Sequence, residues 1–465
     1  MITSLYTFVT PFASSIVAPA ALAYSKDFGI TNSTIASLTV SIFLLGFAFG
    51  PLILAPLSEM YGRLVVMHTT TLAFFLFTLG CALAQNTEQM IVLRFFSGLF
   101  GSAPLALGVG ILSDVWKPME LARASAVFAL GPLIGPVVAP IISGFIVENL
   151  QWRWVNWILC ILIGVTAITG AIVYRTETYA VVILNRRAAR ARKETGNPHL
   201  HTVFETTKDL ATTFRIAIVR PIKLLAMNPV LLALGLFMAF VYGFLYLMFV
   251  TFPTLFAGVY GQTPGIAGLN YIGPGVGFML GLGIWTPVMQ HFFERLTAAN
   301  NGVSKPEFRL PVLFFGGVLC PVGLFWYGWS AENSLHWIMP LIGAAIFCCG
   351  MIAVFTAIQT YIIDMSPRYA ASAISAATLF RSLFGFSFPL FGGQLYEKLG
   401  YGWGNSLLGF IAIPLGLIFP YVIYKYGEPL REAAEKRLDR SEMKVAKRGE
   451  ERAARRAEKK LALPK

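Results

Sequence analysis

Charged residues are scarce in this chain. Asp, Glu, Lys and Arg together make up 13% of the 465 residues, whereas hydrophobic residues make up 56%. A soluble globular protein carries about a quarter charged residues, because its surface faces water. The composition therefore excludes an ordinary soluble domain and indicates a membrane protein.

Cysteine is also rare, and a phosphate-binding loop is absent. The five cysteines all lie in apolar stretches and form neither a disulfide framework nor a metal-ligand pattern. No G-x(4)-G-K-[ST] loop occurs, which excludes an ATP-driven pump of that type. The net charge of +13 does not indicate nucleic acid, because the basic residues lie between and after apolar stretches. We expect no metal, no cofactor, no nucleic-acid partner and no enzymatic activity.

Long apolar stretches are what the chain has in abundance. Each is long enough to cross a hydrocarbon layer about 30 Å thick at 1.5 Å per residue. They lie near residues 3–24, 34–56, 65–84, 89–112, 123–147, 154–174, 229–256, 264–290, 310–330, 335–361, 370–393 and 402–425. We therefore predict an all-α membrane protein with twelve transmembrane helices.

The basic residues are distributed unequally between the two sides of this layout. The short loops on the side of the N-terminus hold Arg63, Lys117, Arg123, Arg295, Lys305, Arg309 and Arg368, and the other side holds Lys26, Arg153 and Lys398. Because positive loops stay in the cytoplasm, we predict that both termini lie inside. The basic run 185–193 forms either a helix on the inner membrane surface or a solvated linker helix. From Glu428 onward we expect a solvated helix.

The chain repeats itself at a shift of 249 residues. This shift superposes Pro140 on Pro389, Gly144 on Gly393, Glu148 on Glu397, Trp154 on Trp403 and Asn156 on Asn405. A parallel repeat of this kind predicts two six-helix bundles of the same orientation. The predicted units are residues 1–174, a cytoplasmic linker at 175–228, residues 229–425 and a cytoplasmic tail at 426–465.

The loop after the second stretch carries the most specific motif. It runs from Ala55 to Arg63 as Ala-Pro-Leu-Ser-Glu-Met-Tyr-Gly-Arg and resembles the loop signature G-x-L-x-D-x-x-G-R of the major facilitator superfamily. Ala55 replaces the first glycine, and Leu64 replaces the usual second basic residue. The resemblance implies that a gate made of Glu59, Gly62, Arg63 and Asp114 locks the outward-open state. An ordinary loop ion pair is the alternative.

The fifth stretch contains glycine and proline at helical spacing. Gly131, Gly135, Pro136, Pro140 and Gly144 predict a bent helix with a bare face for close packing. The first three match the superfamily's antiporter motif, G-x(3)-G-P-x(2)-G-G, which is linked to export. A bend without directional meaning is the alternative.

By contrast, no Asp, Glu or His lies in the middle of an apolar stretch. A carboxylate is the usual intramembrane partner of a cationic substrate, so its absence argues against a polyamine. We predict a cavity for neutral or anionic aromatic molecules. The candidate lining residues are Arg94, Tyr242, Tyr246, Asn270, Tyr271, Gln359 and Arg381. Arg94 alternatively snorkels to the nearby outer surface.

Further stretches, among them Thr176–Tyr179 and Gln359–Asp364, resemble the fungal twelve-span drug:proton antiporter branch of the same superfamily. The resemblance implies a monomer that exports small hydrophobic or aromatic compounds, such as drugs, toxins or secondary metabolites, across the plasma membrane. Proton coupling would use Asp27, Glu148 or Asp364, or the substrate's own proton, or be absent. An importer or facilitator of an organic acid or polyamine is the alternative function. Asn32 begins an N-glycosylation sequence close to the membrane.

Overall fold

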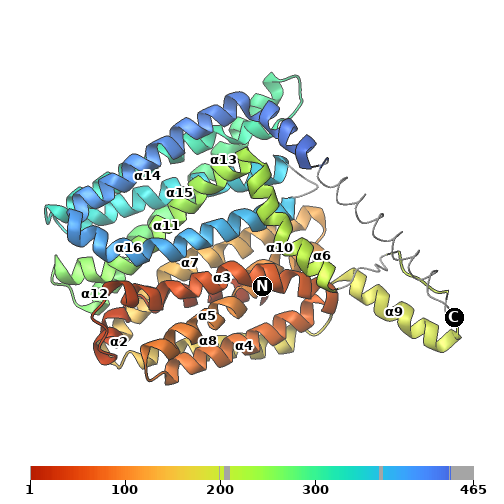
Figure 1. Cartoon of the computed structure of the whole chain (residues 1–465), viewed down its shortest axis with the longest axis horizontal. Helices are drawn as coiled ribbons and strands as arrows, with labels where there is room; N and C mark the ends of the chain where they lie inside the picture. Colours follow the sequence, from red (N-terminus) through yellow and green to blue (C-terminus); the bar gives the residue numbers. More distant parts are fainter. Residues whose placement is uncertain (1, 198, 204–209, 366–369, 439, 441–465) are drawn as a thin grey trace, which may run out of the picture.

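The computed structural model describes residues 2–197, 199–203, 210–365, 370–438 and 440. Side chains at 118, 119, 121–123, 126, 210–213 and 215–217 are not described. The described chain contains helices and no strands, and most of the helices run side by side in one bundle (Figure 1). We call its two ends inner and outer, following the predicted cytoplasmic side.

Eight helices come before the predicted linker. They are α1 (Ile2–Ser15), α2 (Ala21–Asp27), α3 (Ser33–Tyr61), α4 (Arg63–Leu83), α5 (Thr87–Gly101), α6 (Ala103–Val115), α7 (Pro118–Asn149) and α8 (Arg153–Val173). The linker region holds α9 (Ala180–Thr195) and α10 (Leu210–Met227). After it come α11 (Pro229–Gly258), α12 (Pro264–Leu269), α13 (Ile272–Ala299), α14 (Pro311–Glu332), α15 (Ile338–Met365) and α16 (Ala370–Ile413), with short turns at Pro306–Arg309 and Pro414–Ile418.

Ten helical stretches of the described chain are long and apolar enough to cross a membrane. The last of them, Ala370–Leu438, has 69 residues and is interrupted at Gly400, whose φ of 70° and ψ of 175° are not helical. It therefore accounts for two of the predicted spans. The first predicted span is divided between α1 and α2 by a break at 16–20. The prediction of an all-α membrane protein is confirmed.

The helices form two groups. Two apolar clusters join residues of α1 to α8, and a third, larger cluster joins residues of α10 to α16 and the helix that follows, with side chains of α7 packed against it. The first group lies in the lower part of Figure 1 and the second in the upper part. Between the groups, α3 packs against α16 and α7 packs against α12. The residue boundaries of the two units stay predictions.

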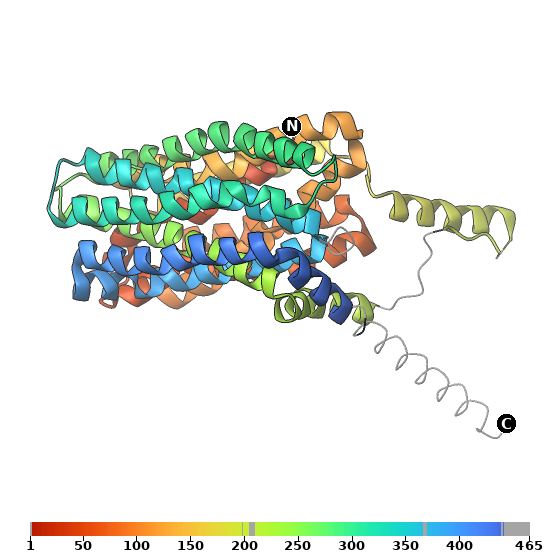
Figure 2. The same cartoon turned by 90° about the horizontal axis from the view of Figure 1, so that it is seen from above.

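The linker helix α9 projects beyond the inner end of the bundle in both views (Figures 1 and 2). This position agrees with a linker helix surrounded by solvent better than with one lying along the bilayer. Of its basic residues, Arg186 reaches back and donates to the Tyr61 carbonyl at 3.1 Å.

The first part of the predicted tail contacts the helix bundle, which was not predicted from the sequence. Residues 419–438 are helical, and Glu428 accepts a hydrogen bond from Lys305 at 2.8 Å. This bond raises the pKa of the Lys305 ammonium. Arg431 lies 3.6 Å from the buried Glu307 carboxylate. The expectation of a plain solvated helix is therefore wrong for this part, and residues 441–465 lie outside the described chain.

Glycines let α3 and α5 approach each other closely. A Cβ atom at Gly46 would overlap the Phe95 carbonyl, and one at Gly98 would overlap the Phe43 carbonyl. Both obstacles are helix backbone, which cannot rotate away as a side chain can. Small residues at helix contacts are the usual way to pack membrane helices at short range.

We expect Gly98→Ala to destabilise the protein, because one added methyl group must separate α3 from α5. Overpacking of a tight core costs about 1–3 kcal/mol, so the melting temperature of the solubilised protein should fall by several degrees. The matched control is Gly283→Ala in α13, where no described atom lies within 4 Å of an added Cβ. Equal melting temperatures for the two variants would contradict this account of the contact.

Candidate functional site

The turn between α3 and α4 is built on Gly62 and an acidic side chain. Gly62 has φ 106° and ψ 153°, a conformation that only glycine adopts readily. The Glu177 carboxylate accepts hydrogen bonds from the backbone N–H groups of Arg63 (2.9 Å) and Leu64 (3.2 Å). These groups have no partner inside α4 because they belong to its first turn. A side chain at position 62 would overlap Glu177, so the turn requires glycine.

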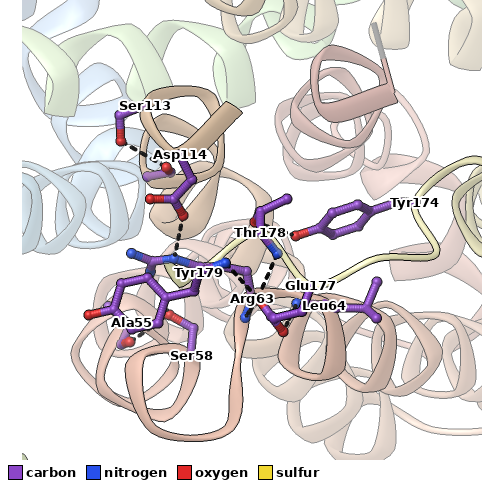
Figure 3. A network of polar contacts seen from close by, with 11 residues as sticks. Ala55, Ser58, Arg63, Leu64, Ser113, Asp114, Tyr174, Glu177, Thr178 and Tyr179 are labelled. Carbon is purple, nitrogen blue, oxygen red and sulfur yellow. Dashed lines mark hydrogen bonds and ion pairs between the residues drawn. The ribbon is translucent and has the colours of Figure 1, made fainter. Parts of the chain in front are cut away.

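The Arg63 guanidinium joins this turn to two other helices. Its Nε lies 3.5 Å from Asp114 Oδ2 in α6, and its Nη1 donates to Ser58 Oγ of α3 at 2.8 Å. It also lies over the Tyr179 ring at 4.8 Å, and burial raises the pKa of Tyr179, so that this ring stays neutral. We call Ser58, Arg63, Asp114, Glu177 and Tyr179 the inner clamp (Figure 3). The ion pair is largely shielded from solvent, which makes it stronger than an exposed pair.

The acidic members of the clamp differ in part from the predicted gate. Asp114 does pair with Arg63. Glu59, however, is exposed and forms no hydrogen bond or ion pair with any described residue. Glu177 was not predicted as a clamp residue, although it lies in Thr176–Tyr179, one of the stretches that resemble the fungal branch of the superfamily. Whether any of these residues gates transport stays a prediction.

A second inner ion pair repeats this arrangement in the other helix group. Arg309 Nε lies 2.9 Å from Asp364 Oδ2, and its guanidinium lies 3.8 Å from the centre of the Phe293 ring. Arg309 precedes α14, as Arg63 begins α4, and Asp364 ends α15, as Asp114 ends α6. Each half therefore has an arginine–aspartate ion pair between two of its helices at the inner end.

Arg94 of α5 is buried inside the first helix group, with 1% of its surface exposed. Its Nη1 donates to the Ala13 carbonyl at 3.1 Å, and its guanidinium lies 4.9 Å from the centre of the Phe43 ring. The usual helical donor to that carbonyl, the N–H of Val17, lies in the break after α1 and forms no backbone hydrogen bond with a described residue. Arg94 thus caps a carbonyl that the broken helix leaves free.

Arg381 of α16 is only half-buried and lies beside aromatic rings. Its guanidinium is 4.7 Å from the centre of the Tyr242 ring and 5.4 Å from that of Phe355. The Tyr242 and Tyr246 rings are 5.0 Å apart, and the Tyr246 hydroxyl is hydrogen-bonded to Ser14 Oγ of α1 at 2.8 Å. These side chains therefore lie where the two helix groups meet.

Asn270 and Tyr271 lie at the break between α12 and α13 and serve the fold. Asn270 donates to the Gln262 side chain, and the Tyr271 hydroxyl donates to the Phe249 carbonyl. That carbonyl has no helical donor, because the residue four positions on is Pro253, which lacks an N–H. Both side chains are buried and hydrogen-bonded within the second helix group.

The structure thus brings together part of the predicted cavity set. Tyr242, Tyr246 and Arg381 are neighbours, and Phe355 joins them as a residue that sequence reasoning missed. Arg94 is packed within the first helix group, where it bonds to the Ala13 carbonyl next to Ser14, the partner of Tyr246. Gln359 is exposed on α15 and forms no hydrogen bond with a described residue.

The glycine and proline positions of α7 pack against α1. A Cβ atom at Gly131 would lie 2.9 Å from Phe8 N, and one at Gly135 would lie 2.9 Å from Phe8 O. Pro136 and Pro140 lie inside the helix, as the bent-helix prediction requires. The contact keeps two helices of the same half at backbone distance.

The outer end of α7 closes against the other helix group. A Cβ atom at Gly144 would overlap the Pro264 carbonyl. One turn further on, the Glu148 carboxylate accepts hydrogen bonds from Gly265 N (2.8 Å) and Thr263 Oγ1 (3.2 Å). These contacts join the first half to the start of α12, and we call them the first outer seal.

The second outer seal is its counterpart in the repeat. A Cβ atom at Gly393, the repeat partner of Gly144, would lie 3.1 Å from the Ser33 side chain. Gln394 Nε2 donates to Thr34 Oγ1 at 3.3 Å. Asn32 is exposed and caps α3 by accepting from Thr34 N at 2.9 Å. Both seals lie where a glycine of one half meets the start of a helix of the other half.

The chain forms two groups of membrane-length helices that contact each other through α3 with α16 and through α7 with α12, an arrangement typical of a membrane transporter. The chain belongs to the Major Facilitator Superfamily, whose family model matches residues 3–389. The inward-open xylose transporter XylE from E. coli shares the fold, with a TM-score of 0.67 at 11% identity, covering 91% of this chain and 94% of that chain.

Curated relatives from fungi are much more similar in sequence. The efflux pump radE of Floropilus chiversii is 42% identical over 429 residues, which cover 92% of this chain and 79% of that protein. The MFS transporter cpaT of Aspergillus oryzae is 45% identical over 430 residues, which cover 92% of this chain and 86% of that protein. The resemblance predicted from the loop and helix motifs is confirmed.

We expect Glu177→Ala to weaken the inner clamp, because α4 then loses the carboxylate that caps its first turn. Loss of a helix cap costs about 1 kcal/mol, and the transport rate should change with it if the clamp is a gate. Melting temperature and transport rate measure the two effects. Glu59→Ala is the matched control and should leave both values unchanged. A larger effect at Glu59 would restore that residue as the acidic member of the gate.

Proposed function

We propose that this transporter exports small hydrophobic or aromatic compounds across the plasma membrane, driven by protons. The observation that carries the proposal is the aromatic group Tyr242, Tyr246 and Phe355 at the junction of the two halves. Rings of this kind offer apolar area to a flat substrate, and the Tyr246 hydroxyl adds a polar handle. The hydrogen bond between Tyr246 and Ser14 of α1 joins the two halves beside this group, which supports a role for it in rocking of the halves.

The absence of acid near these rings narrows the substrate. Tyr242 and Tyr246 lie in α11 and Phe355 lies in α15, and the only carboxylate on either helix is Asp364, near the inner end of α15. A polyamine would need several carboxylates in the cavity to replace its hydration. The site therefore supports neutral or anionic compounds, and it favours an organic acid over a polyamine in the alternative function.

The outward direction is supported by the relatives and by α7. Two of the similar proteins carry the name efflux pump, radE of Floropilus chiversii and vrtL of Penicillium aethiopicum. The glycine and proline positions of α7 agree with the exporter motif at Gly131, Gly135 and Pro136.

For proton coupling, the structure favours Glu148 among the three carboxylates predicted at the mouths. Asp27 accepts from Trp152 Nε1 at 2.7 Å and pairs with Arg153 at 3.6 Å. Asp364 pairs with Arg309. Glu148 forms no ion pair with a described residue and bridges the two halves, so its protonation would act directly on an outer seal.

Export can be measured as retention of Nile red, a neutral aromatic dye, in a yeast strain that lacks its own drug exporters. We expect cells that express the protein to retain less dye than cells with empty vector, and a protonophore should abolish the difference. Greater retention would establish import instead. Lower retention that resists the protonophore would exclude proton coupling.

A reversible cross-link supplies the control for alternating access. In Ser33→Cys/Gly393→Cys, the Cβ atom built at Gly393 is 3.1 Å from the Ser33 Cβ, so a small separation of the two helices brings the pair to the roughly 3.5–4.5 Å of a disulfide. Oxidation should fasten the second outer seal and stop efflux, and a reductant should restore it. Ser33→Cys alone and Gly393→Cys alone should each remain active, both after oxidation and after reduction. Full efflux by the oxidised pair would contradict rocking at this seal.

A further inference from the structure

We propose that Arg381 recognises the anionic group of the transported compounds, so that the preferred substrates are aromatic acids. The inference rests on the proposed function for the transport itself, but it concerns the chemical class of the ligand. It predicts that binding depends on one guanidinium and on the charge of the ligand.

The first step is the position of the arginine. The Arg381 guanidinium lies against the faces of two rings, at 4.7 Å from Tyr242 and 5.4 Å from Phe355, on two different helices. These rings lie beside the contact between the halves, because Tyr246 is 5.0 Å from Tyr242 and hydrogen-bonded to Ser14. A ligand at this point would touch an aromatic surface and a cation at once.

The second step is the missing counter-ion. Arg381 forms no ion pair or hydrogen bond with any described residue, and its buried Nε has no hydrogen-bond partner. A guanidinium carries five donors and keeps its charge at any physiological pH. A cation held within a membrane span without a carboxylate is unfavourable unless water or a ligand solvates it. An anion that binds here would gain attraction without displacing a protein carboxylate.

The third step is the contrast with the other intramembrane arginine. Arg94 is 1% exposed and donates to the Ala13 carbonyl inside its own helix group. Arg381 is half-buried, so part of its surface is open to a ligand. Arg94 also has two buried nitrogens, Nε and Nη2, without a hydrogen-bond partner among the described residues. The two arginines therefore differ in access: Arg94 is enclosed beside the carbonyl that it caps, whereas part of Arg381 is exposed.

Planar rings and a carboxylate satisfy both parts of this site. A guanidinium forms two parallel hydrogen bonds with a carboxylate, a geometry that an amide cannot match and an ammonium opposes. The Tyr242 and Phe355 rings would hold the apolar body of the ligand. The ligand class is therefore a compact aromatic carboxylate or a similarly delocalised anion.

The test uses the intact transporter in lipid nanodiscs and equilibrium dialysis with three probes of one shape: 2-naphthoate, 2-naphthamide and 2-naphthylmethylammonium. We expect 2-naphthoate to bind about tenfold more tightly than the amide, and the ammonium to bind most weakly. Arg381→Gln should remove the preference for the acid and leave the affinity for the amide within about twofold. Arg381→Lys should retain part of the preference.

Lys398→Gln is the matched control, because it removes one positive charge from an exposed outer position. It should bind all three probes as the native protein does. Equal affinity of the native protein for acid and amide would overturn the inference, as would an unchanged acid preference in Arg381→Gln. Nile red export without an acid preference would refute only the substrate class. An Arg381-dependent acid preference without export would refute only the proposed function.

Discussion

A membrane-spanning chain has no water available inside the hydrocarbon layer, and this constraint governs where each polar group of the protein lies. Helices satisfy their own backbone, so difficulties arise only where a helix breaks. At the break after α1, Arg94 donates to the Ala13 carbonyl. In α11, Pro253 removes the donor to the Phe249 carbonyl, and the Tyr271 hydroxyl replaces it. Two side chains that resemble substrate ligands in the sequence therefore complete the solvation of the backbone. Arg381, by contrast, donates no hydrogen bond to a backbone carbonyl of the described chain, so its guanidinium is available to a ligand.

The same constraint moves the strong ion pairs to the inner ends of the helices, where each half uses one arginine and one aspartate. Arg63 with Asp114 and Arg309 with Asp364 occupy corresponding places in the two halves, each joining the start of the third span to the end of the fourth. An ion pair at this depth is shielded from bulk water while its charges remain near the membrane surface. Each half is thereby stiffened at its inner end, and relative motion is left to the interface between the halves.

Hydropathy was sufficient to predict a membrane protein of many helices, and the short motifs at Ala55–Arg63 and Gly131–Pro136 were sufficient to predict the family, because both signals are read from neighbouring residues. The pair Arg63 with Asp114 also followed from a known signature. Glu177 did not, because its contact with α4 spans more than a hundred residues and depends on how the chain returns after α8. The sequence also did not predict how exposed each intramembrane arginine is. Hydrophobic periodicity cannot distinguish Arg94, which is packed within one half, from Arg381, which lies where the two halves meet. The sequence repeat matched Gly144 with Gly393 and so indicated that the two glycines have corresponding positions. Their contact partners, Pro264 and Ser33, could be identified only from the structure.

At the outer end, the two halves are joined by hydrogen bonds and close glycine contacts, without an ion pair between described residues. Among the described residues, four hydrogen bonds join the halves there or near the centre: two at Glu148, one at Gln394 and one at Tyr246. Such bonds contribute about 1 kcal/mol each, so together they are comparable with the roughly 5.5 kcal/mol needed to convert a strongly closed population into a strongly open one. The glycine contacts add close packing but no covalent or charged link. On the proposed mechanism, protonation of Glu148 and binding of one ligand at Arg381 would together supply free energy of this order. Larger seals, with buried ion pairs between the halves, would hold the transporter in one state.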